Sequence, residues 1–115
     1  MIKATFFEAQ GDIRGFELSG HAMFDVEGPD IVCAAVTAMT NLVINTLTEV
    51  FKADLATRVD GDTATIRSML DSVSLKEESA VVGVMKGFML QLKDLQEQYP
   101  DNLEVTIQQN ITKGN

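Results

Sequence analysis

One cysteine and one histidine occur in the whole chain, and they stand twelve residues apart, at Cys33 and His21. A thiol becomes a nucleophile when a nearby base accepts its proton, and histidine is the usual base near neutral pH. Any thiol–imidazole catalysis in this chain must therefore use this pair. Each residue also has a plainer interpretation. An isolated cysteine in an apolar helix is often a small buried hydrophobic residue, and a loop histidine is often simply exposed.

The residues around Cys33 predict a helix that begins close to the thiol. Pro29 interrupts extended structure and Asp30 has the features of an N-cap, so the helix should cover about residues 31–52. This start places Cys33 in the first turn, where N–H groups and the helix dipole stabilise an anion. Asp30 has two candidate roles. It either caps the helix or orients His21 as the third member of a triad.

Two further residues flank the candidate pair. Thr37 follows Cys33 by one helical turn on the same face, so its hydroxyl can reach the sulfur or a substrate carbonyl. A threonine at such a position more often bonds to its own helix. Gly20 directly precedes His21 and leaves the neighbouring backbone uncrowded. Both are therefore candidate supporting residues.

Residues 20–29 contain two glycines and a proline without regular periodicity, and we expect them to form a loop. Gly20 and Gly28 bracket this loop and have the character of hinges. Met23 and Phe24 are candidates to line a pocket for an aromatic side chain. We expect the loop to be mobile alone and to order around a bound peptide.

Composition limits the partners and the cofactors. The chain has 115 residues, a net charge of −8 and a pI near 4.4. Direct nucleic-acid binding is disfavoured because it needs a basic patch, whereas a basic protein or peptide is a natural partner. No metal site is credible with one histidine and one cysteine, and no glycine-rich phosphate loop is present, so we expect no metal and no cofactor.

The same composition indicates a location in the cytoplasm. A single cysteine fits a reducing compartment and excludes an internal disulfide framework. No signal-peptide layout is apparent at the start of the chain. The longest continuous apolar run, residues 31–38, is too short to cross a bilayer, so we expect no membrane association.

Hydrophobic periodicity predicts an α+β domain over residues 1–109, followed by a frayed tail at 110–115. Period-two alternation marks strands at 2–7 and 13–19, a third strand beginning near Leu55, and a last strand at 103–107. Asp60-Gly61-Asp62 predicts a hairpin turn, with a fourth strand at 63–69. The order β-β-α-β-β-α-β would pack two helices on a mostly antiparallel sheet.

The two helices carry different patterns. The first half of the helix at 31–52 is apolar nearly all round, which predicts burial. The second helix should begin after a capping box, Ser74 to Glu77, and end at Pro100. Its apolar stripe comprises Val81, Met85, Phe88, Met89, Leu92 and Leu95.

Residues 20–22 (GHA), a short acidic and aromatic loop, and residues 28–36 (GPDIVCAAV) together resemble the signature of the ribosomal-processing cysteine proteases, the Prp family. Length, acidity and the expected order of elements agree with this family along nearly the whole chain. Two positions depart from the signature. Thr37 stands where the family usually has serine, and the loop reads Met23-Phe24-Asp25 where the family often has a tyrosine.

The resemblance implies that Cys33 is the nucleophile, that His21 is the base, and that Gly20, Asp30 and the hydroxyl at position 37 support them. It implies an endopeptidase that removes the N-terminal extension of large-subunit ribosomal protein number twenty-seven during ribosome assembly, cutting after an aromatic residue. It also implies a homodimer.

The alternative is a non-enzymatic acidic assembly factor that binds a basic ribosomal protein. That alternative accounts for the charge but not for the placement of the only Cys and His.

Overall fold

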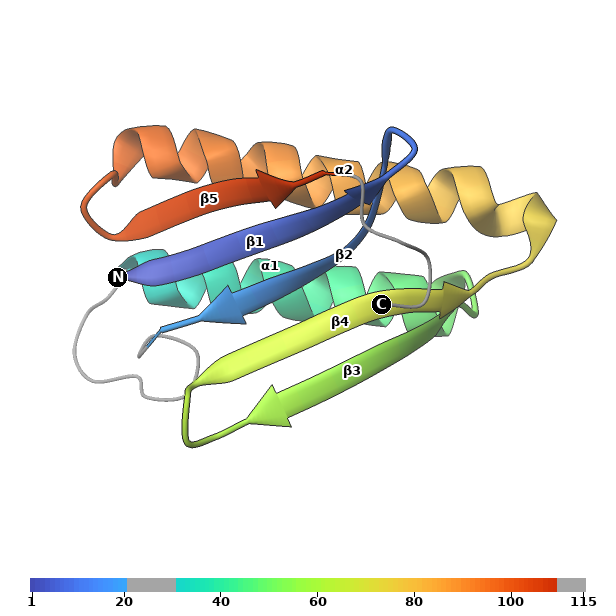
Figure 1. Cartoon of the computed structure of the whole chain (residues 1–115), viewed down its shortest axis with the longest axis horizontal. Coiled ribbons are helices and arrows are strands. Elements are labelled where there is room, and N and C mark those ends of the chain that lie inside the picture. Colours follow the sequence, from blue (N-terminus) through green and yellow to red (C-terminus); the bar gives the residue numbers. More distant parts are fainter. Residues whose placement is uncertain (21–30, 110–115) are drawn as a thin grey trace.

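A computed structural model describes residues 1–20 and 31–109 of the chain. Five strands form one sheet, and two long helices lie on one face of it (Figure 1). The expectations for a mobile loop at 20–29 and a frayed tail at 110–115 fall on residues 21–30 and 110–115, outside the described part, and stay predictions. In chain order, the elements are β1 (Ile2–Ala9), β2 (Asp12–Ser19), α1 (Ile31–Asn45), η2 (Thr46–Val50), β3 (Asp54–Asp60), β4 (Thr65–Ser72), α2 (Leu75–Gln98) and β5 (Leu103–Gln108).

The sheet has the order β3-β4-β2-β1-β5. The β1–β2, β2–β4 and β3–β4 pairs are antiparallel, whereas β5 returns parallel to β1. The predicted α+β class, the β-β-α-β-β-α-β order and the mostly antiparallel sheet are confirmed. Gln10 and Gly11, both with positive φ, make the turn between β1 and β2.

The core lies between the sheet and the helices. Phe6 of β1 and Phe16 of β2 point from the sheet to the same ring, Phe88 of α2, with centroids 5.5 and 5.2 Å away and edge-on geometry. All three rings are at most 4% exposed. The whole predicted stripe of α2 is buried as well. The apolar side chains that recur every second residue in the strands thus pack against those that recur every 3.6 residues in the helix, and together they form one apolar layer.

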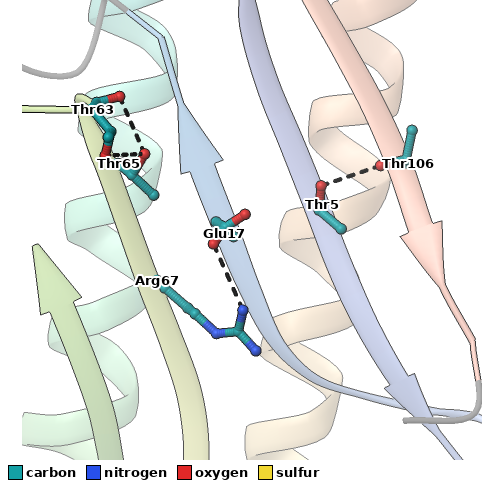
Figure 2. Close-up of polar contacts among 6 residues, drawn as sticks. All are labelled: Thr5, Glu17, Thr63, Thr65, Arg67 and Thr106. Carbon is teal, nitrogen blue, oxygen red and sulfur yellow. Dashed lines mark hydrogen bonds and ion pairs between the residues drawn. The ribbon is translucent and has the colours of Figure 1, made fainter. Parts of the chain in front are cut away.

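The other face of the sheet contains a buried ring that alternation does not predict. Phe7 is only 4% exposed although its neighbour Phe6 faces the helices. The guanidinium of Arg67 lies 4.6 Å from the centroid of the Phe7 ring, and an ion pair of 3.7 Å joins Arg67 to Glu17 (Figure 2). Thr5 and Thr106 share a hydrogen bond of 3.3 Å on β1 and β5 (Figure 2). Arg67 therefore covers Phe7 while its charge stays paired.

The first helix differs from its prediction in two ways. It is α-helical to Asn45 and continues as π-helix to Val50, and Lys52 then has a φ of +56°, outside the helix. The expected burial of its first half on all sides is wrong, because Ile31 is 66% exposed and Ala34 and Ala38 are exposed as well. Only one face of α1 packs against the core, and the opposite apolar face lies on the surface of the single chain.

The combined helix at Ile31–Val50 is long and apolar enough, by length and composition alone, to cross a membrane. The shorter run at 31–38 is therefore not a sufficient reason to exclude a span. A core helix meets the same criterion, and this helix contributes Val36, Val43 and Leu47 to the core of the domain.

Two smaller predictions around β4 and α2 are wrong. The fourth strand begins at Thr65 rather than at residue 63, because Ala64 has a φ of +50° and belongs to the turn. Ser74 is the N-cap of α2, but its side chain makes no capping hydrogen bond. The N–H of Glu77 donates instead to the carbonyl of Ser74, over 3.0 Å.

Candidate active site

Cys33 is the third residue of α1, so the predicted position in the first helical turn is confirmed. Its side chain is only 1% exposed and packs in the core with Val32 and Val36. The first turn of α1 contains no acidic residue. The first-turn N–H groups of α1 therefore have no acidic side chain of their own turn beside them.

Thr37 lies one turn after Cys33 and is half-buried. A separation of four residues places both side chains on the same face of α1. Cys33 is buried, whereas Thr37 is partly exposed. Along this face of α1, the side chains therefore become more exposed from Cys33 to Thr37. The supporting role of the Thr37 hydroxyl at the sulfur stays a prediction.

Gly20 follows the last residue of β2, and its backbone has a φ of +130°. Its N–H donates to the carbonyl of Ala64 over 3.1 Å. A Cβ at this position would stand 2.7 Å from the carbonyl oxygen of Met1 and 3.1 Å from the Cα of Ile2. Only glycine fits here, because both the conformation and the space exclude a side chain.

Five of the predicted site residues lie outside the described part of the chain: His21, Met23, Phe24, Gly28 and Asp30. Their roles as base, loop contacts, hinge and cap or triad member stay predictions. The described elements on either side of them, β2 and α1, meet the undescribed segment at one end of the molecule. Figure 1 shows that β2 ends and α1 begins at the same end of the molecule, next to the chain N-terminus.

Sequence reasoning missed Met1 and Ala64 as neighbours of Gly20. Both act through backbone carbonyls, so their side-chain types carry no signal. Ala64 is 44 residues from Gly20 in the sequence. The sequence also predicts a strand at residues 63–69, and so assigns Ala64 to that strand and not to the turn before it. The positive φ of this turn residue is unusual for alanine and is visible only in three dimensions.

Among residues 1–20 and 31–109, no group of three or more His, Cys, Asp or Glu side chains is arranged to hold a metal ion. The chemistry available in the described part is that of a buried thiol at a helix N-terminus. A thiolate at such a position can attack a carbonyl, as the nucleophile of a thiol hydrolase does.

Comparison with known proteins identifies the class more closely. The family model described as "Cysteine protease Prp" matches residues 1–104. The ribosomal processing cysteine protease Prp of Bacillus subtilis (strain 168) is 30% identical over 109 residues, which cover 92% of this chain and 96% of the relative. The chain therefore belongs to the Prp family of cysteine proteases. This membership favours a peptidase over a non-enzymatic binding module.

Solved structures share the fold. SMU.848 from Streptococcus mutans superposes with a TM-score of 0.83 at 28% identity, covering 96% of each chain. The essential ribosomal processing protease Prp from S. aureus, solved with a covalently linked product peptide, gives 0.78 at 17% identity, over 94% of this chain and all of that one. The S. aureus protein with a substrate peptide gives 0.77 at 16% identity, with the same coverage.

Proposed function

We propose that Cys33 and His21 form the catalytic dyad of an endopeptidase that removes the N-terminal extension of large-subunit ribosomal protein number twenty-seven. One observation carries the assignment of the nucleophile. The chain belongs to a cysteine protease family, and it has a single cysteine, which lies in the first turn of α1. No other residue can supply the thiol.

In the proposed mechanism, His21 accepts the proton of the Cys33 thiol, and the thiolate attacks the scissile carbonyl. A tetrahedral oxyanion forms and then collapses. The leaving amine takes the proton from the imidazolium, and a thioester remains on Cys33. His21 then takes a proton from water, and the resulting hydroxide attacks the thioester. The C–S bond breaks, the extension leaves with a new carboxyl group, and the Cys33 sulfur takes the proton back from His21. First-turn N–H groups of α1 are suitably oriented donors for the oxyanion.

Supporting roles follow for the neighbours of the dyad. The hydroxyl of Thr37 is available to the sulfur or to the substrate carbonyl, and Asp30 caps the helix or orients His21. Gly20 sets the exit of the chain from β2. Met23 and Phe24 are proposed to contact the aromatic residue before the scissile bond, with Gly28 as a hinge of the same loop.

The substrate class is supported by relatives and by charge. The Bacillus relative is named for ribosomal processing, and the S. aureus protein was solved with substrate and product peptides. The net charge of −8 complements a basic ribosomal protein. Asp60, the last residue of β3, and Asp62, in the turn that follows, are both exposed and lie at the end of the sheet that also holds Gly20. These charges favour the approach of a cationic peptide.

The direct test is incubation with a peptide that spans the junction between the extension and the mature ribosomal protein. Mass spectrometry should find one cut after an aromatic residue, and iodoacetamide should block it by alkylating Cys33. Reaction with iodoacetamide well below the pH at which ordinary thiols react would indicate an activated thiolate. A protein that binds the peptide without cutting it, and whose thiol reacts only as an ordinary one, would contradict this function.

We infer that the enzyme is a homodimer, with the exposed face of α1 as the contact. Residues 31–48 contain no charged side chain, although the chain as a whole carries a charge of −8. Leu42 and Ile31 are each 66% exposed on this face. Two like-charged copies associate most readily through a face without charge, so a second copy fits it better than a charged partner does.

The dimer is tested by sedimentation of two variants. Leu42→Glu adds a charge to the exposed face of α1 and should shift the protein to monomer. Leu75→Glu is the matched control, because Leu75 is 90% exposed at the start of α2 and should leave the dimer intact. A monomeric wild type, or dimers in both variants, would contradict the assignment of this face.

The proposal places this enzyme in the cytoplasm, as a single domain of residues 1–109 without cofactor, metal, nucleic acid or membrane partner. A lone cysteine that must stay reduced supports the compartment. Cell fractionation tests it. Recovery in the membrane fraction would assign the apolar helix at Ile31–Val50 to a bilayer instead of to the core and the dimer.

A further inference from the structure

Gly20 is the last described residue before the segment that contains His21, and its backbone is held from two sides. Its N–H donates to the carbonyl of Ala64 over 3.1 Å. The carbonyl oxygen of Met1 stands so close that a Cβ on Gly20 would lie 2.7 Å from it. The end of β2 is therefore fixed between the start of β1 and the turn that joins β3 to β4.

The β1 side of this contact is itself anchored. The N–H of Ile2 donates to the carbonyl of Asn102 over 2.9 Å, and the N–H of Asn102 donates to the carbonyl of Tyr99 over 3.0 Å. Ile2 also begins the parallel pairing of β1 with β5, opposite Leu103. The position of Met1 is thus set by the connection between α2 and β5.

The Ala64 side is a turn with several internal hydrogen bonds. One carboxylate oxygen of Asp60 accepts the N–H of Asp62 at 3.0 Å and that of Thr63 at 3.4 Å. The hydroxyl of Thr63 donates to that of Thr65 at 3.0 Å, and the Thr65 hydroxyl donates to the Thr63 carbonyl at 3.2 Å (Figure 2). These bonds define the turn up to the residue that bonds to Gly20.

Ala64 adopts a φ of +50°, which alanine rarely does because its Cβ approaches the following carbonyl. Such a conformation persists only where the surroundings demand it. The conformation of Ala64 fixes the direction of its own carbonyl, which accepts the bond from Gly20. The left-handed geometry at Ala64 and the place where the chain leaves β2 are therefore coupled.

We propose that Ala64 is a positioning residue for the catalytic base: its left-handed backbone aims a carbonyl at the Gly20 N–H and so fixes the chain one residue before His21. This proposal rests on the proposed function, in which His21 accepts the proton from Cys33. Ala64 touches no reacting atom. It acts by limiting where the imidazole can be placed relative to α1, and a misplacement of about 1 Å can cost about 100-fold in rate.

Three variants in the one turn test the proposal. Ala64→Val disfavours a positive φ, because a branched Cβ is rarely tolerated there, while Ala64→Gly accepts that φ freely. Gly61→Ala is the matched control, since a Cβ at position 61 meets nothing within 4 Å. If Ala64→Val does not fold, Ala64→Leu replaces it as the milder strained variant. Each protein is measured for melting temperature, hydrogen exchange of the Gly20 amide, and kcat and KM for peptide cleavage against pH.

The expected result separates positioning from folding. Ala64→Gly and Gly61→Ala should match the wild type in exchange of the Gly20 amide and in kcat and KM, whatever small change each makes in melting temperature. Ala64→Val should speed exchange of the Gly20 amide and lower kcat at neutral pH by about 10- to 100-fold with a smaller change in KM. Part of that loss should return at high pH, where the thiolate forms without a base. A purely structural defect would instead lower activity by the unfolded fraction alone.

Two outcomes overturn the proposal while the proposed function stands. In one, Ala64→Val leaves the Gly20 amide protected. In the other, that amide exchanges faster but kcat keeps its wild-type pH profile. A His21→Ala variant measured alongside distinguishes a deeper failure. If it cleaves at the wild-type rate, the base in the proposed function is wrong, and the positioning role is refuted with it.

Discussion

Replacing Cys33 by alanine separates chemistry from packing in this enzyme. The side chain is 1% exposed, so the change removes one fully buried sulfur atom from the core. A buried atom of about that size contributes about 1 kcal/mol, and the small cavity adds little. A domain with a total stability of about 5–15 kcal/mol stays folded after such a loss. The melting temperature should fall by about 4–8 °C.

The effect on catalysis should be far larger. Removing the nucleophile of a hydrolase costs about 10⁴-fold or more in rate. This factor corresponds to about 5.5 kcal/mol of activation free energy, several times the loss in stability. Circular dichroism and thermal melting measure the first quantity, and peptide cleavage followed by mass spectrometry measures the second.

Val36→Ala is the matched control for this experiment. Val36 is fully buried in the same helix, and truncation removes two methyl groups, at a cost of about 2 kcal/mol in stability. This variant should therefore melt below Cys33→Ala and still cleave the peptide. Cleavage by Cys33→Ala at a rate near the wild type would refute the reasoning, because no second thiol exists in the chain.

The remaining predictions concern the base, the aspartate and two glycines. His21→Ala should lose most activity at neutral pH and regain part of it at high pH, as rates against pH will show; normal cleavage at neutral pH would exclude the dyad. Asp30→Asn should keep the melting temperature, because asparagine caps as well as aspartate, and should lose activity if Asp30 orients His21. Wild-type kcat in that variant would leave Asp30 as a cap only. In urea unfolding, Gly15→Ala should cost about 1–3 kcal/mol, because its Cβ would stand 2.7 Å from the Ser68 carbonyl, whereas Gly87→Ala, with open space around it, should gain about 0.5–1 kcal/mol. Equal stabilities of the two glycine variants would contradict the contacts described for Gly15.

The sequence by itself determined the class of fold and the one residue that can supply a thiol. Alternation at Ile2, Ala4 and Phe6 predicts one buried strand face, and the stripe from Val81 to Leu95 predicts one buried helix face, both of which the structure has. These patterns are readable because side-chain direction depends on local backbone geometry alone. The position of Cys33 in the first helical turn follows in the same way from Asp30 and Pro29 beside an apolar run.

Only the tertiary structure decided which residues far apart in the sequence come into contact. The ring of Phe7 is buried because Arg67, on a strand that is not its neighbour, reaches over it. Gly20 is fixed by carbonyls of Met1 and Ala64, which no short window of sequence contains. Such contacts join backbone atoms far apart in the chain, and a carbonyl is the same in every residue type. Residue types and spacing therefore indicate which groups are candidates for chemistry, whereas the placement of backbone groups such as those around Gly20 depends on long-range pairing that only the folded chain has.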